Sequence, residues 1–461
     1  MSMLSPRIIV AGTHSGVGKT SVSLALVAAL RRKGLRVQTF KVGPDFLDPS
    51  YLALASGRPC YNLDGWMSGR DYVCQLFTRA SRGAEISVIE GVMGLFDGAD
   101  PITAEGSTAE IARWLEAPVV LVASAHGLAR SFAAMVKGYD SLEPDLRVAG
   151  VIANQCGSRQ HGEWLSRSLA ASSQPPLLGA IPRGIFPKLS SRHLGLVTAD
   201  RENLSPSVLD ALAEALELHV STEGILRLAR SAPPLKTSLT ERTAVSKQVR
   251  IGVARDEAFH FYYQDLFDEL EFQGCELIPF SPIVDRRLPE QCHGLYIGGG
   301  YPEEHAGALS ANESMLAEIR EFAASGRPVY AECGGLMYLS QGLATLDGNK
   351  YPLVGLLPAA TRMLERKKVL GYVEVTLRDH SLWGSKDTLL RGHEFHYSEM
   401  TADPAGQQGW RALYSLKGRR AESVRGEGFQ REGVLASYVH LHLAPCPEAV
   451  KTFIAHCGVK S

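Results

Sequence analysis

The stretch 8–20 carries residue types that bind phosphate. A strand-like apolar run leads into a glycine-rich loop, which ends in Lys19 and Thr20 before an apolar stretch with helical spacing. Glycines let backbone N–H groups approach phosphate oxygens, the lysine meets the charge of the β- and γ-phosphates, and a threonine hydroxyl can ligate Mg²⁺. The pattern departs from G-x-x-x-x-G-K-[ST], because Thr13 replaces the first glycine and Gly12 lies one residue too early. We predict a phosphate-binding loop; the alternative is a strand-to-helix turn with an incidental lysine.

Glu90 follows the apolar run 86–89, which is typical of a buried strand. It therefore stands at the carboxyl end of that strand, where α/β sheets place their ligands. A carboxylate there, together with the Thr20 hydroxyl, supplies oxygen ligands of the kind that Mg²⁺ requires. We predict that Glu90 occupies a Walker-B-like position beside the glycine-rich loop.

Three aspartates lie in loops after predicted strands of the same half. Asp45 and Asp48 occupy a proline-bounded turn after the strand at 36–40, and Asp97 lies in the loop after Glu90. Asp45 is a candidate further oxygen ligand for Mg²⁺. The alternative for each aspartate is turn formation, since Asp beside Gly or Pro is common in loops for that reason alone.

The second half contains a cysteine in a context that suits a nucleophile. The apolar run 328–331 leads through Glu332 to Cys333, and two glycines then precede a helical stretch at 337–341. Glycines relieve the crowding of a sharp strand-to-helix elbow. The helix N-terminus is expected to lower the pKa of the thiol, and its N–H groups can face an oxyanion. The alternative is an inert buried thiol.

A late histidine is a candidate partner for this cysteine. The predicted strand 434–439 runs into His440, and a Cys–His pair suits acyl transfer, with the histidine accepting the thiol proton. His440 alone would be read as a structural histidine. His442 either orients His440 or faces the other side of the strand, and the second reading is preferred. The polar segment 391–397 has the H-x-x-H spacing of some metal sites, but it lacks a third soft ligand and does not look helical. We predict a loop or a strand end at the domain interface, with substrate contact as the alternative.

Strand-like and helix-like segments alternate through both halves of the 461 residues, which predicts two α/β domains. A Pro-, Ser-, Thr- and Lys-rich segment separates them. The predicted division is a domain at 1–232, a linker at 233–248 and a domain at 249–461. Asn154 ends the apolar run 148–153, where an adenine contact is expected, with an ordinary strand-end turn as the alternative.

Composition restricts the classes of partner. The sequence is 45% hydrophobic and 21% charged with a formal net charge of -1, which gives no electrostatic reason to expect nucleic acid or an anionic membrane. We see no signal peptide and no apolar run of spanning length, so a cytoplasmic protein is expected. The eight cysteines include no C-x-x-C pair, which argues against both a zinc site and a disulfide framework.

Six motifs together resemble those of the corrinoid amidases. They are Gly12-Thr13 through Gly18-Lys19-Thr20, the stretch 41–49, Glu90-Gly91-Val92-Met93-Gly94, Gly298-Gly299-Gly300-Tyr301-Pro302-Glu303, Glu332-Cys333-Gly334-Gly335 and His440-Leu441-His442. Over nearly its whole length the chain is similar to the cobyrinic acid a,c-diamide synthase family. The resemblance implies a dethiobiotin-synthetase-like P-loop domain with a parallel sheet, followed by a class I glutamine amidotransferase α/β domain. It also implies amidation of the a and c acetate carboxylates of cobyrinic acid in cobalamin biosynthesis, through an acyl phosphate and ammonia from glutamine.

The resemblance carries residue roles with it. The implied ATP contacts are Gly12, Thr13, Gly16, Gly18, Lys19, Thr20 and Asn154. The implied Mg²⁺ ligands are Thr20, Asp45 and Glu90, and the residues lining the synthetase site are Lys41, Asp48 and Asp97. In the glutamine site the implied nucleophile is Cys333, the base is His440, and the oxyanion and glutamine contacts are Gly299, Gly300 and Gly334. Most class I amidotransferases have an acid two residues after the histidine, whereas the corrinoid branch generally manages with a Cys–His pair.

Related activities remain open at this point. The same chemistry could act on hydrogenobyrinic acid or nickel-sirohydrochlorin, while the stretch 41–49 resembles the a,c enzymes more than cobyric acid synthase. A different class is a partition-type P-loop ATPase switch, but such proteins carry a second lysine near the loop start, where this chain has His14. The expected partners are ATP, glutamine, Mg²⁺ and a tetrapyrrole, with no nucleic acid and no membrane; a homodimer is compatible with the resemblance.

Overall fold

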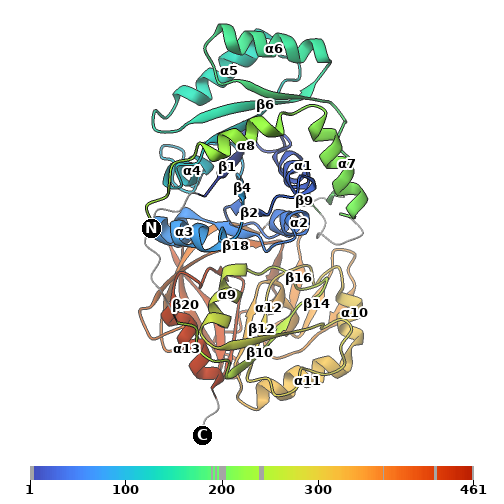
Figure 1. Cartoon of the computed structure of the whole chain (residues 1–461). Coiled ribbons are helices and arrows are strands. Elements are labelled where there is room, and N and C mark those ends of the chain that lie inside the picture. The colour runs from blue at the N-terminus through green and yellow to red at the C-terminus, as the bar shows by residue number, and fades with distance from the viewer. Residues whose placement is uncertain are drawn as a thin grey trace. The chain divides into compact units, whose positions relative to one another are not determined.

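The structure is a computed structural model that describes residues 5–187, 191–192, 195–196, 204–237, 243–366, 368–419 and 423–458. The chain forms two compact units, 1–241 and 242–461. The division between them falls inside the segment 233–248 that we predict as the linker, and residues 238–242 of that segment lie outside the described residues. Each unit contains its own sheets (Figure 1).

The first unit is built on one parallel sheet with the strand order β3-β2-β4-β1-β5-β6-β7. Its elements are β1 (Arg7–Gly12), α1 (Lys19–Arg32), β2 (Val37–Val42), α2 (Leu47–Ser56), β3 (Tyr61–Leu63), α3 (Gly65–Ala80), β4 (Ile86–Glu90), α4 (Thr108–Trp114), β5 (Val119–Ser124), α5 (Arg130–Ser141), β6 (Val148–Cys156), α6 (Arg159–Ala171), β7 (Leu177–Pro182), β8 (Ser191–Arg192), β9 (Gly195–Leu196), α7 (Pro206–Glu217) and α8 (Thr222–Arg230). Helical crossovers between parallel strands explain the alternation seen in the sequence.

Both faces of this sheet are covered, which explains why its strands read as continuous apolar runs. In β1, Ile8 and Val10 join the apolar cluster that contains α1, α2, α7 and α8. Ile9 and Ala11 point to the opposite face and join the cluster that contains α3 and α4. Because β1 is central in the sheet, the loop that follows it opens at the middle of the carboxyl edge.

The second unit has a ten-stranded mixed sheet in the order β11-β10-β12-β13-β22-β21-β20-β17-β18-β23, and a four-stranded sheet, β15-β14-β16-β19. Its elements are β10 (Val249–Ala254), α9 (Gln264–Phe272), β11 (Cys275–Phe280), β12 (Gly294–Ile297), α10 (Ala306–Ala311), α11 (Glu313–Ala324), β13 (Val329–Glu332), α12 (Gly334–Leu339), β14 (Gly342–Ala344), β15 (Lys350–Pro352), β16 (Thr361–Met363), β17 (Val369–Leu377), β18 (Leu389–His396), β19 (Ser398–Met400), β20 (Arg411–Gly418), β21 (Val424–Arg431), β22 (Val434–Ser437), β23 (His440–Leu441) and α13 (Pro447–Cys457). In this spatial order of the ten-stranded sheet, all neighbours from β11 through β22 pair in parallel. All neighbours from β22 through β23 pair antiparallel.

The predicted α/β class is therefore confirmed for both halves, but one local prediction holds only in part. We expected a loop or strand end at 391–397, whereas residues up to His396 belong to β18, which pairs with β17 on one side and with β23 on the other. The histidines of this segment misled the prediction, because polar residues in a strand are read as exposed. Within the described ranges, no helix has the length and apolar character needed to cross a membrane.

Candidate active sites

The glycine-rich loop connects β1 to α1 in the first unit, in the predicted order of strand, loop and helix. Gly16 and Gly18 have φ angles of 81° and 98°, in the left-handed region that favours glycine. A Cβ on Gly12 would lie 2.7 Å from a methyl carbon of Val17, so the loop start also needs a glycine. The Lys19 side chain is buried, and its Nζ donates to the backbone oxygens of Met93 and His14. The lysine is therefore held over the loop by backbone acceptors.

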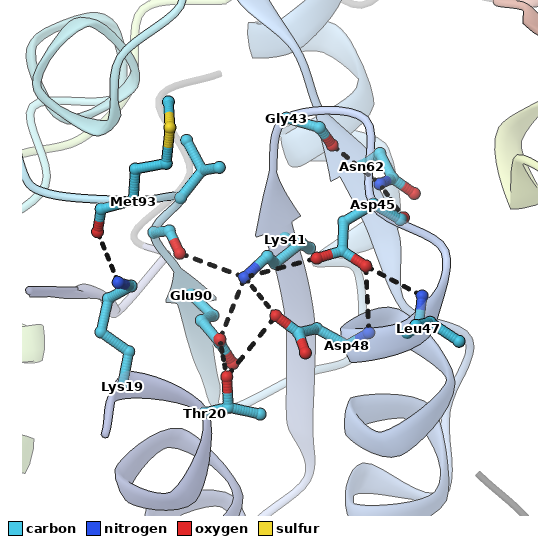
Figure 2. A network of polar contacts seen from close by, with 12 residues as sticks. Lys19, Thr20, Lys41, Gly43, Asp45, Leu47, Asp48, Asn62, Glu90 and Met93 are labelled. Carbon is cyan, nitrogen blue, oxygen red and sulfur yellow. Dashed lines mark hydrogen bonds and ion pairs between the residues drawn. The ribbon is translucent and has the colours of Figure 1, made fainter. Parts of the chain in front are cut away.

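Figure 2 shows the polar cluster beside this loop, whose central side chains come from α1, β2, α2 and β4. Thr20 Oγ1 donates to Glu90 Oε1 at 2.7 Å. Lys41 Nζ lies 3.0 Å from the same carboxylate oxygen and 2.6 Å from Asp48 Oδ2. The strand register explains the meeting, because Glu90 of β4 is paired with Val10 on one side and with Lys41 on the other. The structure thus brings together residues that the sequence spreads over 70 positions.

The pKa shifts in this cluster arise because the Lys41 cation is buried among the carboxylates of Asp45, Asp48 and Glu90. Burial alone would lower the pKa of Lys41, but Asp48, Glu90 and Asp45 outweigh it and raise that pKa above its ordinary value. Burial raises the pKa of Glu90, with Lys41 opposing it. Burial also disfavours the charged form of Asp48, but Lys41 keeps the pKa of Asp48 below its usual value. Burial and the repulsion of Lys41 lower the pKa of Lys19.

Two of the predicted aspartates also serve as turn residues. Asp45 Oδ1 accepts hydrogen bonds from the backbone N–H groups of Leu47 and Asp48, at 2.8 and 3.1 Å, while its Oδ2 lies 3.9 Å from Lys41 Nζ. Burial and Asp48 raise the pKa of Asp45 to about 7. Asp97 Oδ2 accepts from Gly94 N at 2.9 Å. One oxygen of Asp45 and one of Asp97 therefore stabilise a turn, as the alternative interpretation expected. Metal binding by Asp45 and the place of Asp97 in the synthetase site stay predictions.

Oxygen ligands for Mg²⁺ are available at this cluster. The Oε2 atom of Glu90 is buried and has no hydrogen-bond partner among the described residues. A buried carboxylate oxygen without a partner is costly unless a cation or a donor meets it. No group of three or more His, Cys, Asp or Glu side chains in the described part of the chain is arranged to hold a metal by itself. The Thr20 hydroxyl and the Glu90 carboxylate are hard oxygen donors of the kind that Mg²⁺ binds, with water and phosphate oxygens completing its shell.

Asn154 lies against the loop backbone. Its Nδ2 donates to Val17 O at 2.8 Å, and its Oδ1 accepts from Gln155 N at 2.9 Å. A Cβ on Gly18 would lie 2.4 Å from Nδ2, so the amide and the loop are in close contact. Asn154 thus braces the phosphate loop, and a contact with the nucleotide base stays a prediction.

The cysteine elbow of the second unit has the predicted order of strand, cysteine and helix. Cys333 stands between β13 and α12 with φ 50° and ψ −102°, and its N–H donates to Ser437 O at 2.7 Å. A non-glycine residue at such a positive φ is strained, and strain of this kind clusters at functional sites. A Cβ on Gly335 would lie 2.2 Å from Ile297 O, which explains the glycine that follows the elbow.

The predicted lowering of the thiol pKa is wrong. The pKa of Cys333 is raised above its ordinary value by burial and by the charge of Glu303, with a smaller opposing effect of a hydrogen bond from Gly334 N. The helix α12 has only six residues, so its N-terminus does not outweigh burial beside acids. The thiol is therefore protonated, and a base must remove the proton before it can attack.

His440 begins β23, which follows β22 in the chain, and β22 pairs with the strand that precedes Cys333. The parallel pair β13 and β22 sets Glu332 opposite Ser437, and His440 follows three residues later. A Cβ on Gly299 would lie 2.5 Å from His440 Cε1. A Cβ on Gly334 would lie 3.1 Å from Gly300 N. The glycine loop after β12 therefore contacts both the histidine and the residue after the cysteine. A role of its N–H groups at an oxyanion stays a prediction.

Alanine at Gly299 is expected to impair the glutamine site specifically. No left-handed φ constrains this residue, but the new methyl group would overlap the His440 ring, so the ring must move. Displacing a catalytic base by a fraction of an ångström is expected to lower the glutaminase kcat by about 10- to 100-fold. Steady-state release of glutamate measures this. Gly307→Ala is the matched control, because its Cβ would lie at an ordinary 3.6 Å from Tyr351 Cε1, and equal losses in both variants would contradict the assignment.

The sequence assigned no role to two polar residues near His440, Glu332 and His393. Glu332 Oε2 lies 3.8 Å from His440 Nδ1, and the His393 ring stacks on His440 at 5.0 Å between centroids. Burial, with smaller electrostatic effects of His440 and His442, lowers the pKa of His393 well below its ordinary value. His442 Nε2 lies 2.7 Å from Asp265 Oδ2. The sequence offered one signal for Glu332, its position directly before Cys333. The contacts of His440 with Glu332 and His393 join segments that are distant in the sequence, so no local pattern predicts them.

Comparisons with known proteins match both halves. Residues 8–197 match the CobQ/CobB/MinD/ParA nucleotide binding domain, and residues 250–447 match the CobB/CobQ-like glutamine amidotransferase domain. The chain is 54% identical over 460 residues to a protein of Syntrophotalea carbinolica named cobyrinate a,c-diamide synthase, with 100% of both chains covered. Proteins of that name from Leptospira interrogans and Archaeoglobus fulgidus are 42% and 40% identical, covering 99% and 97% of this chain and the same shares of their own length. These similarities extend over both units.

Proposed function

The chain belongs to the cobyrinate a,c-diamide synthase family, and from this premise we propose that it amidates two acetate carboxylates of cobyrinic acid in cobalamin biosynthesis. Glutamine supplies the nitrogen and ATP activates the carboxylates. The observation that carries the proposal is the presence in one chain of two features: a lysine–carboxylate cluster beside a glycine-rich loop, and a cysteine elbow that contacts the same glycine loop as His440. Each site alone would explain only half of an amidation.

In the second unit, glutamine hydrolysis begins at Cys333. His440 takes the thiol proton as the sulfur attacks the side-chain amide carbon, because the thiol itself stays protonated in its buried position. In this proposal the backbone N–H groups of Gly300 and Gly334 donate to the oxyanion. The proposal is supported by the proximity of the two residues, since a Cβ on Gly334 would lie 3.1 Å from Gly300 N, and Gly299 leaves room for the imidazole. His440 then gives its proton to the leaving ammonia, and water hydrolyses the thioester to glutamate.

In the first unit, ATP converts a carboxylate into an acyl phosphate. A carboxylate is a poor electrophile, so ammonia can displace oxygen only after phosphorylation. The loop N–H groups and Lys19 hold the phosphates, while Lys41 and Asp48 line the place where the substrate carboxylate meets the γ-phosphate. Mg²⁺ would be held by Thr20, Asp45 and Glu90, and when bound it supplies positive charge that offsets the charge on the transferring phosphoryl group. Asp97 and Asn154 brace the loops around this site.

Product analysis tests the proposal directly. Purified protein is incubated with ATP, Mg²⁺, amide-¹⁵N-glutamine and cobalt-, nickel- or metal-free tetrapyrroles, and products are identified by mass spectrometry. Two labelled amides on cobyrinic acid are expected. Preference for hydrogenobyrinic acid or nickel-sirohydrochlorin would keep the chemistry and change the substrate. Nucleotide-dependent dimerisation without any amide would instead support the switch-type ATPase.

A further inference from the structure

We infer that Glu332 positions the imidazole of His440 for the attack of Cys333 on glutamine. The inference rests on the proposed glutaminase function of those two residues and adds a third side chain to it. The carboxylate comes from the residue directly before the nucleophile, at the end of β13. It reaches the histidine because β13 and β22 are parallel neighbours, with Glu332 paired to Ser437 just before the His440 strand.

The Glu332 carboxylate is fixed from several sides. Its Oε1 accepts hydrogen bonds from Tyr330 OH at 2.6 Å and from the backbone N–H of Leu441 at 3.1 Å. Its Oε2 accepts from Tyr296 OH at 3.0 Å and lies 3.8 Å from His440 Nδ1. Burial and the charge of Glu332 raise the pKa values of both tyrosines well above the ordinary value, so both hydroxyls remain donors. A carboxylate held by three donors keeps its remaining acceptor capacity toward the imidazole.

The two ring nitrogens of His440 face different groups. Nδ1 is the nitrogen nearer Glu332, whereas a Cβ on Gly299 would lie 3.3 Å from Nε2. Nε2 therefore faces the glycine loop, which meets Gly334 beside the nucleophile. A base that takes the thiol proton through Nε2 must carry its own proton on Nδ1, and a carboxylate acceptor at Nδ1 selects that tautomer. At 3.8 Å the contact is longer than a hydrogen bond; such contacts often tighten when substrate binds.

Two other side chains of this region, His442 and His393, have contacts of their own. His442 is directed to Asp265, with 2.7 Å between Nε2 and Oδ2 and both side chains fully buried. His393 stacks face to face on His440, with 17° between the ring planes, so it contacts the ring face and not its nitrogen edge. The Nδ1 of His393 is instead within 3.1 Å of Tyr263 OH. Among the described residues, a carboxylate contact of His440 is seen with Glu332, whose Oε2 lies 3.8 Å from Nδ1.

Glu332→Gln tests the inference sharply, because the surroundings dictate the orientation of the new amide. The Leu441 N–H requires an acceptor, which places the amide oxygen at the Oε1 position. The NH₂ group then takes the Oε2 position and offers a donor to His440 Nδ1, which favours the Nε2–H tautomer. This form cannot accept the thiol proton at Nε2. The glutaminase kcat is expected to fall by roughly 10²- to 10⁴-fold with KM for glutamine nearly unchanged, as when the orienting acid of a triad is replaced by an amide.

Two further readouts separate positioning from structural damage. Amidation with ammonium salts should keep its wild-type rate, since the first unit is untouched. In ¹⁵N-histidine-labelled protein, the His440 resonances, assigned by comparison with His440→Asn, should change from the Nδ1–H to the Nε2–H pattern. A kcat within about threefold of wild type, a loss carried by KM, or an unchanged tautomer would each overturn the inference.

A second variant decides the question if Glu332→Gln fails to fold. Tyr330→Phe removes one of the donors that fix the carboxylate and should lower the glutaminase kcat by about 10-fold. Tyr338→Phe is the matched control, because its hydroxyl is buried in the same unit without a hydrogen-bond partner among the described residues. Equal kcat values in the two variants would count against positioning by Glu332.

The outcomes also distinguish this inference from the proposed function. Wild-type glutaminase activity in Cys333→Ala or His440→Asn would overturn the function itself. Loss of activity in those two variants, together with a normal kcat in both Glu332→Gln and Tyr330→Phe, would overturn only the role of Glu332.

Discussion

Cys333→Ala is expected to abolish glutamine-dependent amidation and to leave amidation with ammonium salts at its wild-type rate. Without the sulfur no thioester can form, and loss of a nucleophile commonly lowers kcat by roughly 10⁴-fold or more. The ammonia-dependent reaction uses only the site at Lys19, Lys41 and Glu90, which lies in the other unit. Glutamate release and amide formation are measured in parallel with each nitrogen source.

Cys275→Ala provides the matched control for this prediction. Its thiol is buried in β11 of the same unit, and its pKa is raised to about 12 by burial, so it shares the chemistry of Cys333 without the elbow. This variant should use both nitrogen sources normally. If Cys333→Ala lost both reactions, the cysteine would be structural, and if it kept both, Cys333 would not be the nucleophile.

Glu90→Gln is expected to eliminate amide formation from either nitrogen source while sparing basal glutaminase activity. The substitution removes the charge that Lys41 and Thr20 contact and the buried oxygen that is available to a cation. Losing charge at a phosphoryl-transfer site is expected to cost about 10²- to 10³-fold in kcat. Amide formation is measured with glutamine and with ammonium salts, and ATP-dependent phosphate release reports the first step.

Folding must be controlled in this variant, because Lys41 is a buried cation and loses one negatively charged partner. Asp48 remains within 2.6 Å, so Lys41 keeps a charged partner and the fold should persist. Glu110→Gln is the matched control: its carboxyl is partly buried in the same unit, its pKa is raised by burial, and it contacts Gly106 N. Wild-type amidation in Glu90→Gln would remove Glu90 from the proposed metal site.

The sequence alone was sufficient to predict the features that are formed by residues close together in the chain. The phosphate loop, with its strand before and helix after, spans a contiguous stretch in which glycine, lysine and threonine have fixed offsets. The cysteine elbow is likewise contiguous, from β13 through Cys333 into α12. Apolar runs predicted the buried parallel strands, because sheets covered on both faces leave no alternation of polar residues. For the segment 391–397 the prediction of a loop or strand end was only partly right, because buried histidines interrupt the apolar pattern of β18, which ends at His396.

The chain itself, read without its fold, determined that a phosphate loop and a cysteine elbow occur in two successive α/β halves, because short-range spacing encodes both. Only the tertiary structure decided which distant side chains meet them. Strand register brings Lys41 and Glu90 together beside Thr20, and parallel pairing carries Glu332 to His440. The direction of the Cys333 thiol pKa was also decided there, since burial and the charge of Glu303 depend on segments far from the elbow helix.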